Sequence, residues 1–308
     1  MDLADLVARA RDGQPRAVGR LISLIEDGSP RLAELSALLA PLPRTAHVVG
    51  LTGAPGVGKS TSTSALIGQL RKARQRVGVL AIDPSSPFTG GALLGDRIRM
   101  VEHAGDPGVF VRSMATRGQL GGMAAAAPQA VRVLEAAGCS VVLLETVGVG
   151  QSEVGVMRAA DTTVVLLAPG MGDSVQAAKA GILEVADIFV VNKADRPEVS
   201  QVVRSLHDLQ AMTGTGGWTP PILRTVATTG TGFADVVEAI HAHRQWLTGS
   251  GELQRRRVAR ARQEIEAIAL AAYRDRLDGD ATVARLAAAV AAGELDAYRA
   301  AAEVQPGT

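Results

Sequence analysis

A glycine-rich segment that ends in lysine and serine is the part of this chain whose residue types point most directly to chemistry. Residues 53–60 fill every fixed position of the phosphate-loop pattern G-x-x-x-x-G-K-[ST]. An apolar run precedes the segment and a helix-like stretch follows it, so backbone N–H groups and a helix N-terminus would face a phosphate. We expect a nucleoside triphosphate to be held by Gly53, Ala54, Pro55, Gly56, Val57, Gly58, Lys59, Ser60 and Thr61.

A second motif, Asn192-Lys193-Ala194-Asp195, follows another apolar run and predicts the base. The Asp195 carboxylate can accept hydrogen bonds from the ring N–H and the exocyclic amine of guanine, whereas adenine would leave it unpaired. Lysine usage supports both motifs, because 28 of the 32 basic residues are arginine and yet each motif keeps a lysine. We expect guanine to be bound by Asn192, Lys193 and Asp195, with the backbone of Val226, Ala227 and Thr228 closing on its carbonyl.

Three carboxylates are candidates for the Mg²⁺ or water shell of the bound phosphates. Asp83 and Glu145 each come at the end of an apolar run, where ligands of open α/β sheets collect, and Asp96 lies between them. With the Ser60 hydroxyl they form the expected metal site, and with Lys59 the expected catalytic set. Gly148 is expected to give its N–H to the γ-phosphate. The alternative for each carboxylate is a helix or turn cap.

Composition argues against several classes of function. The formal charge is +1 over 308 residues and only 3% of residues are aromatic, so we expect neither nucleic-acid nor membrane partners. The single cysteine, Cys139, permits no intrachain disulfide or thiolate cluster, and its place before an apolar run predicts a core residue. His241 and His243 do not share a helix face, which argues against a metal pair.

The N-terminus does not resemble a signal peptide, and no apolar run approaches the ~18 residues of a membrane span. These features predict a cytoplasmic protein.

Helix-like and strand-like stretches alternate through the middle of the chain and predict an α/β fold, a P-loop NTPase with a mostly parallel sheet. Strand-like runs lie at 47–52, 77–82, 109–112, 140–145, 163–167, 188–192 and 222–226. We expect three parts: an N-terminal helical extension (1–43), a P-loop GTPase domain (44–248) and a C-terminal helical arm (249–308). The arginine run 255–257 is expected on a solvated or dimer-facing side of the arm.

Several segments resemble the MeaB/ArgK-type GTPases, chaperones of adenosylcobalamin-dependent methylmalonyl-CoA mutase. The resemblance covers most of the chain, and it rests on the segments at 53–61, 83–86, 90–100, 117–122 and 145–153. It implies GTP or GDP with Mg²⁺ as cofactors and a C-terminal arm that makes a homodimer. It also implies a GTPase that gates cofactor delivery from an adenosyltransferase to the mutase, protects the mutase, and is accelerated by it.

The sequence departs from the family's pattern at two positions, and the resemblance has one further implication. Gln119 stands where the family has His, and Gly155 where an acidic residue is common; both lie near expected switch regions, where they bear on coupling to a partner. The segment that ends at Lys179 resembles the switch that reports nucleotide state to the mutase, with an ordinary capped helix start as the alternative.

Three other functions are alternatives to the chaperone. One is a kinase linked to lysine, arginine and ornithine transport, although no kinase base motif is evident. Another is a metal-insertion GTPase, which needs Cys and His clusters that this chain does not have. The last is a scaffold in which GTP is structural.

Overall fold

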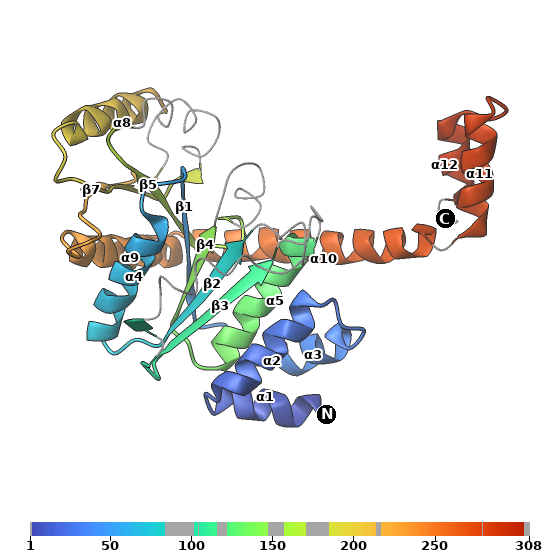
Figure 1. Cartoon of the computed structure of the whole chain (residues 1–308), viewed down its shortest axis with the longest axis horizontal. Coiled ribbons are helices and arrows are strands. Elements are labelled where there is room, and N and C mark those ends of the chain that lie inside the picture. Colours follow the sequence, from blue (N-terminus) through green and yellow to red (C-terminus); the bar gives the residue numbers. More distant parts are fainter. Residues whose placement is uncertain are drawn as a thin grey trace.

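A seven-stranded parallel sheet forms the centre of the protein (Figure 1). The structure is a computed structural model that describes residues 2–83, 102–103, 105–115, 122–146, 157–170, 185–213, 217–278 and 280–304. The strand order is β3-β2-β4-β1-β5-β6-β7, with every strand pair parallel. The strands are β1 (His47–Gly53), β2 (Val77–Asp83), β3 (Val109–Ala115), β4 (Val141–Thr146), β5 (Thr162–Leu167), β6 (Ile188–Val191) and β7 (Ile222–Arg224).

Helices cover both faces of the sheet, because alternate residues of each strand point to opposite sides. On one face the core includes α5 (Gly122–Ala136), and α8 (Val199–Thr213) packs against β5 and β6. On the other face α4 (Lys59–Lys72) and α9 (Phe233–Gly249) share a second core. In β4, for example, Val142 and Leu144 join the α5 core while Val141 and Leu143 join the α4 core.

Three short helices at the N-terminus pack on the outside of α5. They are α1 (Leu3–Arg11), α2 (Pro15–Glu26) and α3 (Leu32–Leu39), and their apolar side chains continue the α5 core. The Asp2 carboxylate caps α1, and Pro15 begins α2 at the position where a missing N–H costs nothing. From β3, Arg112 reaches Ser23 Oγ (2.9 Å) and Glu26 Oε2 (3.3 Å) on α2.

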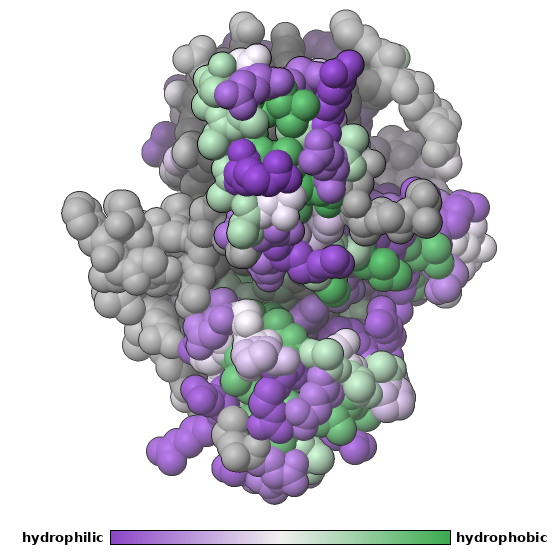
Figure 2. All heavy atoms as spheres, turned by 90° about the vertical axis from the view of Figure 1, so that its right-hand side faces the viewer, coloured by the Kyte–Doolittle hydropathy of each residue, from purple (hydrophilic) through white to green (hydrophobic). Residues whose placement is uncertain are grey.

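The C-terminal helices form an arm that extends away from the sheet (Figure 1). The arm comprises α10 (Glu252–Asp278), α11 (Ala281–Ala291) and α12 (Ala297–Val304). Large apolar side chains on it are exposed, among them Ile265, Leu270 and Tyr298. Figure 2 views the molecule from the arm's end and shows hydrophobic residues interspersed with hydrophilic ones on this face.

The expected fold class is confirmed, and each expected strand is present. The boundaries differ by at most two residues except in β3, which continues three residues beyond its expected end, to Ala115. Cys139 is buried in the core, as expected. Within the described ranges, no helix is long and apolar enough to cross a membrane, and no cluster of three or more His, Cys, Asp or Glu could hold a metal.

Candidate functional site: a phosphate loop and a guanine corner

The phosphate loop joins β1 to the N-terminus of α4 at the carboxyl edge of the sheet. Gly56 and Gly58 have φ of 79° and 95°, a region of backbone conformation that favours glycine, and they turn the chain into α4. The Lys59 ammonium donates to the carbonyl oxygens of Gly53 (2.5 Å) and Ala54 (3.4 Å). Lys59 therefore lies across the loop, in reach of the place where the loop would hold phosphate oxygens.

Two glycines of this loop are required by packing as well as by backbone conformation. Gly53 has φ of 149°, and a Cβ there would collide with the carbonyl oxygen of Leu166 on β5. A Cβ on Gly58 would come 2.5 Å from Asn192 Nδ2. The loop thus sits directly on β5 and on the segment after β6, with no room for a side chain at either position.

Ser60 and Glu145 meet at the edge where a metal ion would bind. The Ser60 hydroxyl is 2.6 Å from Glu145 Oε1, and the Glu145 side chain, on β4, is fully buried. A hydroxyl and a carboxylate at the first turn of the phosphate-loop helix are hard oxygen donors of the kind Mg²⁺ prefers. The two residues are 85 positions apart in sequence, so the fold brings them together.

Other members of the expected metal and phosphate set are placed only in part. Asp83 is the last residue of β2, paired in register with Ala115, so its backbone is at the same edge of the sheet. Asp96 and Gly148 lie outside the described residues, as do Gln119, Gly155 and Lys179.

Asn192 holds the phosphate loop and the last loop of the sheet together. Its Nδ2 donates to Val57 O (2.8 Å), and its Oδ1 accepts from Ala227 N (3.0 Å) and Thr225 Oγ1 (3.3 Å). The side chain is buried, so each of these bonds forms away from water. Asn192 is therefore a structural bridge between two loops expected to contact the nucleotide.

Lys193 and Asp195 complete this corner. Lys193 adopts φ of 57° and reaches over the phosphate loop to donate to Gly56 O (2.8 Å). Asp195 is exposed and has no polar partner among the described residues, which leaves its carboxylate open to a base. The expected contact from the 226–228 backbone takes a different form at Ala227, whose N–H is directed to Asn192 rather than outward.

Sequence reasoning missed one set of contacts close to the site. Ser64, one turn after Ser60 on α4, has its hydroxyl within hydrogen-bond distance of Glu102 and of His103 Nε2 (2.8 Å). Thr225 was also not assigned a role, although it completes the Asn192 bridge. The spacing of Ser60 and Ser64, one helical turn apart, is the only sequence signal that places Ser64 on the same side of α4.

A parallel sheet with this loop, the Ser60–Glu145 pair and the Asn192 corner defines a P-loop GTPase. A family model described as Methylmalonyl Co-A mutase-associated GTPase MeaB matches residues 18–281. The chain belongs to this family, and we conclude that it binds guanine nucleotide and hydrolyses GTP.

Known relatives support the assignment over most of the chain. A protein of Pyrococcus abyssi named as a GTPase is 49% identical over 268 residues, which are 86% of this chain and 83% of the relative. GTPase ArgK of Escherichia coli is 37% identical over 273 residues, 86% and 82% of the two chains. The mitochondrial methylmalonic aciduria type A homolog of Mus musculus is 35% identical over 266 residues, 80% of this chain and 64% of that protein.

A solved structure has the same fold. The crystal structure titled LAO/AO transport system kinase aligns with a TM-score of 0.71 and 28% identity, covering 98% of this chain and 96% of that one.

Proposed function

We propose that this GTPase is a chaperone of a cobalamin-dependent acyl-CoA mutase, methylmalonyl-CoA mutase or a relative of it. In this role it gates the loading of adenosylcobalamin from an adenosyltransferase and protects the mutase from inactivation. The observation that carries the proposal is the match of residues 18–281 to a family described as mutase-associated. The name of the mouse relative, which refers to methylmalonic aciduria, points to the same metabolism.

The residues of the site support hydrolysis by in-line attack of water on the γ-phosphate. Lys59 exchanges its bonds to Gly53 O and Ala54 O for phosphate oxygens and neutralises charge that develops on them. Glu145 orients the Ser60 hydroxyl. Ser60, Asp83, Asp96 and Glu145 are the residues that would hold Mg²⁺ or its water shell. Bound Mg²⁺ would supply electrostatic stabilisation of the transferring phosphoryl group. Asn192, Lys193 and Asp195 form the guanine site: Asn192 and Lys193 tie it to the phosphate loop, and Asp195 selects the base.

Each of the three expected parts of the chain has its own role in this proposal. Residues 44–248 bind and hydrolyse GTP, residues 1–43 form a helical extension on α5, and residues 249–308 form an arm that makes a homodimer. The exposed Ile265, Ile268 and Leu270 of α10 support the last point, because apolar side chains on a projecting helix are costly to leave in water.

The test is GTP turnover with and without a purified cobalamin-dependent mutase. We expect slow intrinsic phosphate release and acceleration of at least about tenfold by the mutase, in line with the effect of partner-supplied groups on other GTPases. Lys59→Ala should abolish both rates. Equal rates with and without the mutase would refute the chaperone role while leaving the GTPase assignment intact, and turnover by Lys59→Ala would refute the role of the phosphate loop.

A second candidate is a kinase of amino-acid transport, because the solved structure with the same fold carries that name. The turnover assay repeated with γ-labelled GTP and a purified amino-acid transport protein separates the two functions. Labelled γ-phosphate that appears on a transport protein would favour the kinase, whereas release of inorganic phosphate alone favours the GTPase.

A further inference from the structure

The long helix α10 is attached to the sheet in an unusual way. None of its residues, 252–278, is buried, and none belongs to the apolar cores of the described structure. A cavity of about 310 Å³, lined in part by Asp187, Arg256 and Arg260, lies between its first turns and the sheet. The helix contacts α5 and α9, but it buries no apolar side chain completely, so the polar contacts of its first turns carry a large share of the attachment.

Arginines one helical turn apart supply that attachment from the side of α10. Arg256 makes a two-pronged contact with Asp187, at 3.0 Å to each carboxylate oxygen, and also donates to Asp161 O (3.0 Å). Arg260 donates to Asp161 Oδ1 and, at 2.6 Å, to Ala159 O. Paired guanidinium–carboxylate contacts of this kind fix direction as well as distance.

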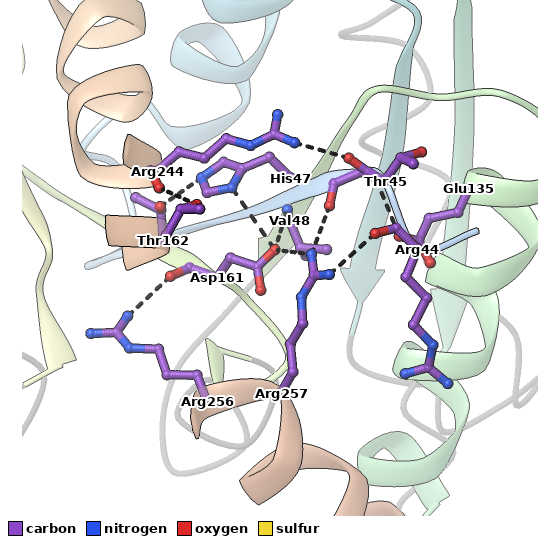
Figure 3. A network of polar contacts seen from close by, with 12 residues as sticks. Arg44, Thr45, His47, Val48, Glu135, Asp161, Thr162, Arg244, Arg256 and Arg257 are labelled. Carbon is purple, nitrogen blue, oxygen red and sulfur yellow. Dashed lines mark hydrogen bonds and ion pairs between the residues drawn. The ribbon is translucent and has the colours of Figure 1, made fainter. Parts of the chain in front are cut away.

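Arg257 joins the helix to a third part of the chain. It donates to Arg44 O and Ala46 O, both at 3.2 Å, in the linker that follows the N-terminal helices (Figure 3). It also lies 3.4 Å from Asp161 Oδ2. The expectation that the 255–257 run is solvated or dimer-facing is therefore wrong for Arg256 and Arg257, which bind the sheet and the linker.

Asp161 is the centre of this joint. Its side chain is fully buried, and its Oδ2 accepts from Val48 N of β1 at 3.0 Å while α10 binds the same carboxylate. Burial alone raises the pKa of Asp161, but the charge and hydrogen bond of Arg260 outweigh that effect and leave the pKa below its usual value. The carboxylate is therefore charged at neutral pH and holds the arginines of α10 against the amino ends of β1 and β5.

We propose that Asp161 and Asp187 form a charged seat that fixes the direction in which the arm leaves the sheet, and so the surface that the arm presents to a second copy of this chain. Asp161 and Asp187 act by positioning the arm. They lie at the amino edge of the sheet, opposite the carboxyl edge that carries the phosphate loop. β1, seven residues long, runs from the seat to the phosphate loop, a distance of about 20 Å at the usual rise per residue. The arm is thereby fixed to the two strands, β1 and β5, that the phosphate loop contacts.

The direct test measures the direction of the arm within one chain. Spin labels are attached at Lys72→Cys on α4 and Arg274→Cys on α10, both exposed positions, in the full-length protein mixed with an excess of unlabelled chain. Cys139 does not interfere, because burial raises the pKa of its thiol to about 11. Pulsed electron resonance then gives the distribution of distances between the two labels.

We expect one narrow distribution with the native seat and a width increased at least about twofold in Arg260→Gln, because Asp161 loses its main charge partner. Arg262→Gln is the matched control: it makes the same change two residues away, where the arginine is exposed and pairs with Glu266 of the same helix. Asp161→Asn removes the carboxylate that binds the arginines and should broaden the distribution as well. Basal GTP turnover of each variant within about twofold of the native rate would show that its nucleotide site is intact.

Unchanged widths in Arg260→Gln and Asp161→Asn would overturn the proposal, as would equal broadening in Arg262→Gln. The distance measurement does not involve the mutase. A result that refutes the charged seat can therefore be told apart from one that refutes the proposed chaperone function.

Discussion

Lowering the pH from 7 to 5 is expected to destabilise the protein through two imidazoles buried next to the seat. His47 Nε2 and His243 Nδ1 contact the same Thr162 hydroxyl, at 2.7 and 2.8 Å. Since that hydroxyl has a single proton, it donates to one ring and accepts from the other. Burial lowers the pKa of each imidazole to about 4, against the opposing charges of Asp161 and Asp187.

The sign and size of the effect follow from linkage. Between pH 6.5 and 4 the unfolded chain binds protons at these histidines that the folded chain does not, so stability is fully present above 6.5 and falls as the pH drops. Over the range from 6.5 to 5 each ring costs about 2 kcal/mol, at 1.36 kcal/mol per unit of pKa difference. Asp161 does not contribute in this range, because its lowered pKa confines its effect to more acidic solutions.

Urea unfolding at pH 5, 6 and 7, followed by circular dichroism, measures this dependence. Both His47→Gln and His243→Gln should reduce the difference in unfolding free energy between pH 5 and pH 7, whatever their effect at pH 7. His207→Gln, at an exposed position of α8, is the control and should leave the difference unchanged. A native protein equally stable at pH 5 and pH 7 would refute the reasoning, and so would a variant that keeps the full dependence.

Three further predictions concern the nucleotide site. Asn192→Ala removes the bridge to Val57, Thr225 and Ala227 and should lower the unfolding free energy by about 2–4 kcal/mol. It should also weaken GDP binding, measured by calorimetry. Thr225→Val removes one bond of the bridge and should lower the unfolding free energy by about 1 kcal/mol. Gly53→Ala should lower stability by more than about 2 kcal/mol in thermal unfolding, while Gly68→Ala in the open face of α4 should be neutral or stabilising by up to about 1 kcal/mol. Asp195→Asn should weaken GTP binding about a hundredfold and improve binding of xanthosine triphosphate in competition titrations, without a change in melting temperature.

Each of these predictions has an outcome that contradicts it. Unchanged GDP affinity in Asn192→Ala would mean that the bridge does not organise the site. Equal stability of Gly53→Ala and Gly68→Ala would contradict the close approach of the loop to Leu166. A GTP preference that survives Asp195→Asn would remove the carboxylate from base recognition.

The sequence alone was sufficient for the fold class and for the two nucleotide motifs. Phosphate binding uses consecutive backbone amides, so the loop at 53–60 can be read from adjacent residues. The alternation of apolar runs with helical stretches likewise reflects local periodicity, and it located each strand of the described sheet to within two residues, except that β3 is three residues longer than expected.

Tertiary structure decided the contacts between residues far apart in the chain. Ser60 meets Glu145 across 85 positions, and Asn192 reaches Val57 across 135, because parallel strands bring their carboxyl ends to one edge. The direction of Arg256 and Arg257 could not be read from a run of like charges, since a helix turns neighbouring side chains by 100° and only the packing shows which face meets the sheet. The pKa values of His47 and His243 depend in the same way on burial that only the folded chain creates.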